Sequence, residues 1–187
     1  SMQGRELPLE VEGIEVFPDK GRQVFTMFGQ KIFSVRNGAA GWKTNQRTGQ
    51  IEAMTEDDLQ SDTKDRNRNT IFLLRQADKP FYRAVFDGTG DEDGTALSYI
   101  ALVDENGKMI CRFGVNGANL IVTKSYDGET PVGEGLVTEV VSDLKVVNGV
   151  KVPMAEQHLL NGQPYASLKI ATYTINGAVP PASFDKP

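Results

Sequence analysis

The stretch Ser142–Pro187, SDLKVVNGVKVPMAEQHLLNGQPYASLKIATYTINGAVPPASFDKP, consists of strand-like runs separated by Asn-Gly pairs. Asn148-Gly149 and Asn161-Gly162 each join two such runs. Asn-Gly favours two-residue hairpin turns because both residues tolerate a positive φ angle. The stretch therefore predicts three antiparallel strands that end at a Pro-Pro stop and a buried Phe184.

Turn residues also separate strand-like runs in the rest of the 187 residues, with further Asn-Gly pairs that begin at positions 37, 106, 116 and 176. Short runs rich in β-branched and aromatic residues alternate with turn residues, as in an antiparallel meander. We predict roughly ten strands in a strongly curved antiparallel sheet or an open barrel. Asp87–Thr95, which is rich in glycine and acids, is predicted to be a loop, and Gln163–Asn176 is predicted to be a strand.

One region follows a helical pattern instead. Thr55 is a candidate N-cap, and the acidic residues after it suit the positive end of a helix dipole. The pattern is polar through Asn69 and apolar from Ile71 to Leu74, so either one helix with a weak middle or two short helices fit. The predicted fold class is mostly β (α+β), with one or two short helices.

Composition restricts the class of protein. The formal net charge is −5 and the pI about 5.0, which argues against nucleic-acid binding. No apolar run is as long as a membrane span. We expect a single domain over residues 1–187, excised from a longer chain, with Ser1-Met2 as a cloning remnant and the signal peptide missing. Cys111, the one cysteine, excludes an internal disulfide and fits a buried apolar position.

The chain offers little for catalysis. His158 is the only histidine, and a zinc peptidase helix needs two. Nothing in the spacing supports a dyad of Cys111 with His158. The acidic Asp87–Asp93 loop lacks the ligand spacing of an EF-hand and fits a solvated hairpin loop. We therefore predict no catalytic residue, no metal site and no cofactor.

Several predicted strands carry apolar side chains on both faces, so both faces must be covered. One face can pack on the helical region. The other can face a second layer of the core or an apolar ligand cavity, and both alternatives remain open. If the cavity exists, its candidate lining residues are Phe25, Met27, Phe33, Val35, Trp42, Met109 and Phe113.

Three stretches, taken in their order and spacing, resemble a LolA-like domain from Val16 to the end of the chain. The first stretch holds Pro18-Asp19-Lys20-Gly21-Arg22, Met27-Phe28-Gly29-Gln30, Asn37-Gly38 and Gly41-Trp42. The second is the acidic helix start Met54–Leu59, and the third is Ser142–Pro153, followed by the ending Ile175–Pro187. Two departures stand out. The long N-terminal helix usual in the family is missing or cut away, and Leu144 stands where the family usually has a tyrosine.

The resemblance implies a half-barrel with helices across its open side and a role in outer-membrane lipoprotein sorting. It also implies a periplasmic or otherwise extracytoplasmic location and a non-catalytic module. Such a module binds an apolar small molecule, a lipid or an acyl chain, or packs on a partner protein domain. The alternative is an accessory, peptidase-associated C-terminal domain of a bacterial insulinase-type zinc metallopeptidase whose catalytic part lies outside this chain.

Overall fold

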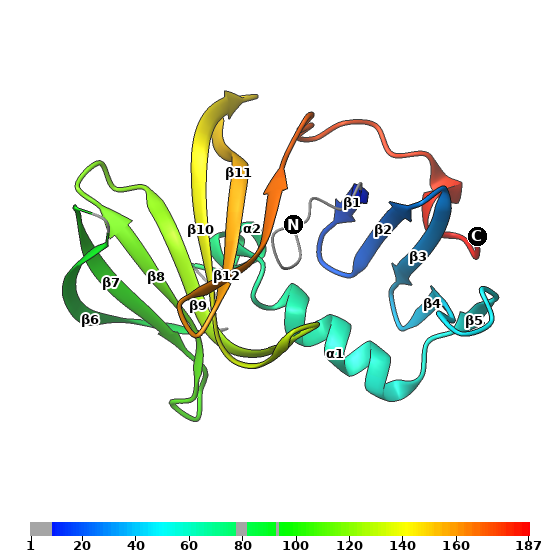
Figure 1. Ribbon diagram of the computed structural model, residues 1–187, viewed down its shortest axis with the longest axis horizontal. Helices are drawn as coiled ribbons and strands as arrows, with labels where there is room; N and C mark the ends of the chain where they lie inside the picture. The colour runs from blue at the N-terminus through cyan, green and yellow to red at the C-terminus, as the bar shows by residue number, and fades with distance from the viewer. Residues whose placement is uncertain (1–8, 78–81, 93) are drawn as a thin grey trace. The chain divides into compact units, whose positions relative to one another are not determined.

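A computed structural model describes residues 9–77, 82–92 and 94–187. Its strands form two antiparallel sheets, and the chain divides into two compact units. Described residues up to 75 form one unit together with 178–187, and residues 76–177 form the other. We call them the five-stranded unit and the seven-stranded unit and describe each by itself (Figure 1).

The five-stranded unit is a meander in which each strand pairs with the next one in sequence. Its strands are β1 (Leu9–Val16), β2 (Lys20–Met27), β3 (Gln30–Asn37), β4 (Ala40–Thr44) and β5 (Ile51–Ala53). Its helices are α1 (Glu56–Arg66), α2 (Thr70–Arg75) and a short 3₁₀ helix, η1 (Pro181–Phe184). Because η1 belongs to this unit, the last ten residues return to the sheet that the N-terminal half builds.

The helical region forms two short helices, one of the two arrangements that the sequence allowed. Thr55 caps α1, and its hydroxyl accepts a hydrogen bond from the Asp58 backbone N–H (3.2 Å). The Asp58 carboxylate accepts a reciprocal bond from the Thr55 N–H (2.9 Å), which completes a capping box. The polar residues between Arg66 and Thr70 separate the helices, and α2 buries Phe72 and Leu73.

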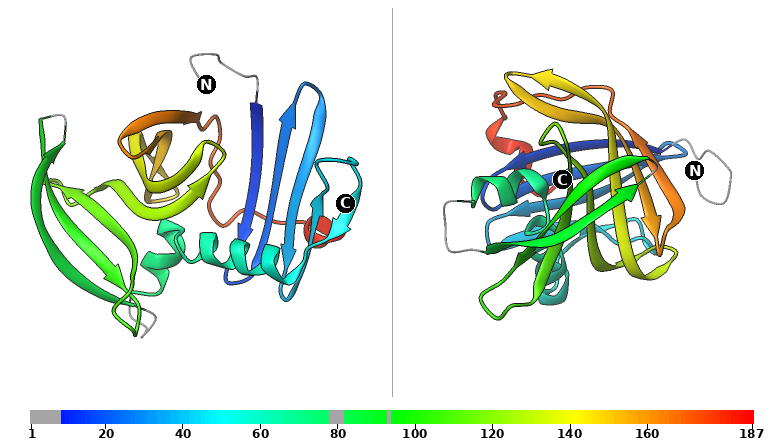
Figure 2. Two further views of the ribbon diagram at one scale, coloured as in Figure 1. Left: turned by 60° about the horizontal axis from the view of Figure 1, so that its bottom comes forward. Right: turned by 90° about the vertical axis from the view of Figure 1, so that its left-hand side faces the viewer.

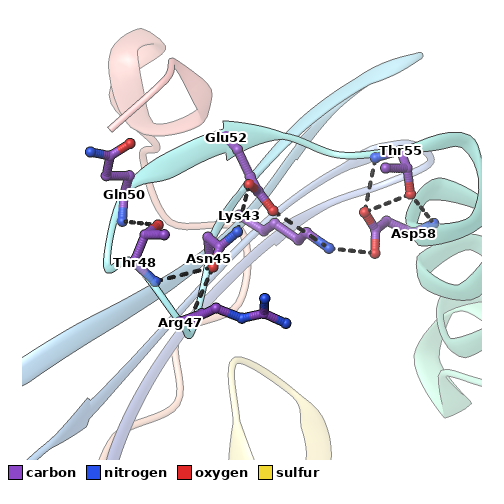
Figure 3. A network of polar contacts seen from close by, with 8 residues as sticks. All are labelled: Lys43, Asn45, Arg47, Thr48, Gln50, Glu52, Thr55 and Asp58. Atoms are coloured by element: carbon purple, nitrogen blue, oxygen red, sulfur yellow. Dashed lines mark hydrogen bonds and ion pairs between the residues drawn. The ribbon is translucent and has the colours of Figure 1, made fainter.

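Polar contacts connect α1 to the sheet, since none of its side chains is buried. Lys43 on β4 donates to Asp58 (2.8 Å), and Arg36 on β3 donates to the carbonyl of Leu59 (3.1 Å). Figure 3 shows how Lys43 lies between Asp58 and Glu52, the residue that also accepts from Asn45 at 2.8 Å. The charged residues of β3 and β4 therefore position the helix.

The Asp58→Asn variant is expected to lose about 1–2 kcal/mol of unfolding free energy at neutral pH. The hydrogen bonds from Lys43 and Thr55 lower the pKa of Asp58 from 3.8 to about 2. Folding therefore disfavours the protonated form, so this stabilisation is present above about pH 4 and is lost as the pH falls through about 2.

Urea unfolding of both proteins between neutral and acidic pH tests this effect. Asp57→Asn, in the same helical turn, serves as the matched control and should change the free energy less. A difference between wild type and Asp58→Asn that stays constant down to about pH 2 would contradict the assignment.

The face of the sheet opposite α1 holds the apolar core of this unit. Val24 and Val35 are buried there, at 3% and 0% exposure. The C-terminal Phe184 is also buried at 4%, and Lys20 Nζ lies 6.0 Å from its ring centroid. Asn37, the cross-strand partner of Lys20, donates to the carbonyl of Phe184 (3.4 Å). The buried position expected for Phe184 is confirmed.

The seven-stranded unit is a second meander, with the order β12-β11-β10-β9-β8-β7-β6. Its strands twist and bend along their length (Figure 2). They are β6 (Arg83–Glu92), β7 (Thr95–Val103), β8 (Met109–Asn116), β9 (Ile121–Thr130), β10 (Gly133–Val147), β11 (Val150–Leu160) and β12 (Gln163–Lys169). The two hairpins predicted around Asn148-Gly149 and Asn161-Gly162 are confirmed, and all four turn residues have positive φ.

Two local predictions were wrong. Most of Asp87–Thr95 belongs to the β6–β7 hairpin, and the sheet register shifts between Phe86 and Thr89. Gly88, with a φ of 90°, lies at this irregularity, so glycine marks a bulge here. The strand predicted over Gln163–Asn176 ends at Lys169 and continues as irregular chain.

The predicted fold class is confirmed: the described residues are mostly β, their sheets are antiparallel, and they include two short α-helices. The strands divide between two sheets, and among the described residues β6 and β12 are the edges of the larger one. The assignment of residues 1–187 to a single domain stays a prediction. No helix among the described residues is long and apolar enough to cross a membrane.

Candidate functional site

One row of cross-strand partners runs across all strands of the seven-stranded sheet. From β6 to β12 the register aligns Phe86, Ile100, Phe113, Lys124, Glu139, His158 and Ala166. Side chains of direct cross-strand partners lie on the same face of a sheet. This set, which we call the cross-strand row, is apolar from β6 to β8 and ionisable from β9 to β11.

The apolar half of the row borders the core of the unit. Phe113 is 4% exposed, and Leu102 and Cys111 are buried beside it as partners of each other. At the sheet edge, Phe86 is 68% exposed. The apolar half therefore runs from a buried aromatic ring to one that solvent reaches.

The ionisable half begins with a largely buried ion pair. Lys124 Nζ lies 2.8 Å from Glu139 Oε2, and the two side chains are 10% and 16% exposed. The Tyr126 hydroxyl donates to the other Glu139 oxygen, Oε1, at 3.0 Å, and Lys124 lies 5.5 Å from the Tyr126 ring centroid. Both oxygens of Glu139 thus have partners, as a buried carboxylate requires.

His158 continues the row. Its Nε2 lies 3.5 Å from Glu156 Oε2, and its ring meets the Tyr165 ring edge-on at 6.1 Å. The hydrogen bond with Glu156 raises the pKa of His158 above 6.5; burial acts against this, and the Glu139 charge adds to it. Burial and then the Glu139 charge raise the pKa of Tyr165. The protonated imidazolium is therefore favoured at this position.

His158 is expected to titrate above 6.5 in an NMR titration, where the only histidine of the chain gives one imidazole signal set. The Glu156→Gln variant should lower that pKa because it removes the main stabilising contact of the imidazolium. Glu129→Gln, an exposed change at the other end of the β9–β10 hairpin, is the control and should leave it unchanged. A wild-type value at or below 6.5 would contradict this prediction.

The seven apolar residues predicted from the sequence to line a ligand site divide between the units. Phe25, Met27, Phe33, Val35 and Trp42 lie in the five-stranded unit, and Met109 and Phe113 lie in the other. Phe25 pairs with Ile32 and Phe33 pairs with Val24, so Phe25 and Phe33 project from opposite faces.

The remaining residues of this set follow the same register. Met27 shares the face of Phe25, whereas Val35 and its partner Trp42, which is half-buried, share the face of Phe33. In β8 a register shift pairs Met109 with Val103, whereas Phe113 pairs with Ile100. Phe113 alone among the seven belongs to the cross-strand row, and the binding role of all seven stays a prediction.

Sequence reasoning missed Lys124 and Glu139. The available signal was a charged residue on an otherwise apolar face of a strand. Glu139 lies two residues from both Val137 and Val141 in β10, so the three side chains share one face. Lys124 likewise lies two residues from Tyr126 in β9 and shares its face. A charged residue on the apolar phase of a strand indicates a buried polar group that must find a partner.

The structure separates the other groups that could carry chemistry. Cys111 on β8 and His158 on β11 are three strands apart, ~14 Å by strand spacing. Near β6, Asp87 pairs with Arg112 (2.7 Å), and Glu92 accepts from the Tyr99 hydroxyl (2.9 Å). Among the described residues, no group of three His, Cys, Asp or Glu side chains could hold a metal ion. Asp93 of the acidic loop lies outside the described residues.

Comparisons with known proteins identify the fold. No protein-family model and no curated protein matches the chain. A crystal structure of a "putative outer membrane lipoprotein-sorting protein domain" from Vibrio parahaemolyticus is similar, with a TM-score of 0.55 at 11% identity, over 95% of this chain and 81% of that one. A DUF1329 family protein from Desulfovibrio piger gives 0.61 at 9% identity, over 99% and 85%. The LolA-like resemblance is therefore confirmed at the level of the fold.

Proposed function

We propose that this chain is a non-catalytic, extracytoplasmic LolA-like module that binds an apolar ligand, either a lipid or the acyl chain of a lipoprotein. The observation that carries the proposal is the apolar half of the cross-strand row. Phe86, Ile100 and Phe113 lie side by side on one face of a curved sheet. An alkyl chain laid across β6 and β7 would contact Phe86 and Ile100, with the buried Phe113 next to them.

The energetics suit a ligand of this kind. Burying each methylene group contributes about 0.8 kcal/mol, so about ten carbons gain roughly 8 kcal/mol before the costs of association. We expect net affinity in the micromolar range or weaker. The similar fold of the Vibrio domain, described as lipoprotein-sorting, supports both the ligand class and the extracytoplasmic location.

Titration calorimetry with octanol, decanol, dodecanol and tetradecanol tests the proposal. A site of finite length should bind longer chains more tightly until the chain exceeds the site, and then stop improving. An unspecific greasy surface should show no such limit. The absence of saturable binding for every chain length would overturn the ligand proposal and favour docking on a partner domain.

Two matched variants locate the site. Phe86 and Phe28 are both exposed, at 68% and 73%, so neither truncation should unfold the protein. Phe86→Ala is expected to weaken decanol binding about 10-fold because it removes part of the apolar half. Phe28→Ala, on the β2–β3 turn, should leave the affinity unchanged. Equal effects of the two variants would place the ligand elsewhere.

The alternative, an accessory domain of an insulinase-type zinc peptidase, stays a prediction. The parent reading frame tests it: a His-x-x-Glu-His motif upstream of Ser1 would support it. Under either proposal the chain itself should show no peptidase activity, because any zinc chemistry would reside in the other part of the protein. Stoichiometric zinc binding that depends on His158 would contradict both.

A further inference from the structure

The ionisable half of the cross-strand row, taken together with Glu156 beside His158 on β11, contains charges of both signs in equal number when His158 is protonated. Lys124 faces Glu139 at 2.8 Å, and His158 faces Glu156 at 3.5 Å. All four side chains are at most 24% exposed. Each charge therefore has a counter-charge beside it in a place that water reaches poorly.

A ligand head group that lies over the ionisable half must suit its equal number of positive and negative charges. A head group with a net charge would lose its hydration and find each opposite charge already engaged, which is costly. An uncharged polar head group loses less, because it can donate to a carboxylate and accept from an ammonium without disturbing either pair. The balance therefore favours hydroxyl, ester or amide groups.

The apolar and ionisable halves adjoin directly, since Phe113 and Lys124 are cross-strand partners. From Phe86 to Lys124 the row spans three strand spacings, ~14 Å. We propose that the ligand is an amphiphile whose uncharged polar head group lies over Lys124, Glu139 and His158 while its alkyl chain lies over the apolar half. This inference rests on the proposed function and adds the chemical class of the head group.

A ligand series with one alkyl chain tests the inference on the wild-type protein. Decanol, monodecanoyl glycerol, decanoate and decylammonium are titrated by calorimetry below their aggregation concentrations, at a pH where NMR shows His158 to be protonated. The two uncharged amphiphiles are expected to bind at least ~10-fold more tightly than the two ions. An ion that binds as tightly as decanol would overturn the inference.

The ligand series distinguishes the proposed function, an apolar ligand site, from the inference about the head group. If no member of the series binds saturably, the proposed function itself fails. If all four bind with similar affinity, the apolar ligand site stands and the head-group inference fails.

Two substitutions unbalance the row in opposite directions. Lys124→Met leaves an excess negative charge, so decylammonium should gain at least ~10-fold relative to decanol. Glu139→Gln leaves an excess positive charge, so decanoate should gain by a similar factor. The double variant, Lys124→Met with Glu139→Gln, restores the balance and should again prefer the uncharged amphiphiles. Unchanged preferences in both single variants would overturn the inference.

A pH series provides the same test without mutation, should a single variant fail to fold. His158 faces Glu156 on its own strand, Glu139 and Lys124 on β10 and β9, and Tyr165 on β12. When the imidazolium loses its proton, the row gains one unit of negative charge. Decylammonium should then gain affinity relative to decanoate as the pH rises through the His158 titration. A ratio that does not change would contradict a head group at this position.

Discussion

The Lys124→Met variant is expected to lose about 3–5 kcal/mol of unfolding free energy, the cost of leaving a buried charge without its partner. Glu139, 16% exposed at its side chain, then loses its ion pair and keeps the hydrogen bond from Tyr126 and the neighbouring charge of His158. Urea unfolding monitored by circular dichroism measures the loss. The stem of methionine replaces most of the lysine stem, so the change in packing is small.

The double variant, Lys124→Met with Glu139→Gln, shows whether the lost unfolding free energy comes from the unpaired charge or from the change in packing. A neutral glutamine can still accept from Tyr126, so the double variant should be at least about 2 kcal/mol more stable than Lys124→Met alone. Strictly additive losses would mean that the two side chains do not interact in the folded protein. The ion pair at 2.8 Å predicts strong coupling instead.

The Phe184→Ala variant is expected to lose about 3–5 kcal/mol, the range for truncating a buried phenylalanine. Phe184 is 4% exposed in the five-stranded unit, and η1, the element that carries it, spans only four residues. Its ring is the buried side chain of η1, so the truncation should also loosen the segment 178–187. Denaturant unfolding and amide hydrogen exchange of that segment measure the two effects.

Phe28→Ala is the matched control for Phe184. Phe28 is 73% exposed, so its truncation should change the unfolding free energy by no more than about 0.5 kcal/mol. A loss below about 1 kcal/mol in Phe184→Ala would mean that the C-terminal segment does not stabilise the five-stranded unit. Similar losses in the two variants would contradict the burial difference between them.

Local signals predicted the parts of this fold that neighbouring residues decide. Asn148 and Gly149, with φ angles of 49° and 82°, close a hairpin because both tolerate that backbone. Thr55 and Asp58 form the capping box at the start of α1, three residues apart. In both places the interacting atoms lie within a few residues of sequence, so a pattern in one chain is enough.

Distant contacts explain the local errors. Asp87 was assigned to a loop because acids and glycines favour loops, yet Arg112 on β8 pairs with it at 2.7 Å. That partner lies 25 residues away, and no local preference encodes it. The predicted strand over Gln163–Asn176 ends early for a related reason: only Gln163–Lys169 finds a partner strand, β11.

The sequence by itself determined the strand-rich class, the hairpin turns, the helix start and the buried character of Phe184. Each depends on backbone preference, local hydrogen bonding or the hydrophobic effect on single residues. The tertiary structure alone decided that Phe184 packs in the five-stranded unit and that Lys124, Glu139 and His158 form one row. The physical reason is register: a slip by one residue moves every side chain of a strand to the other face, and only the pairing of whole strands selects among the registers.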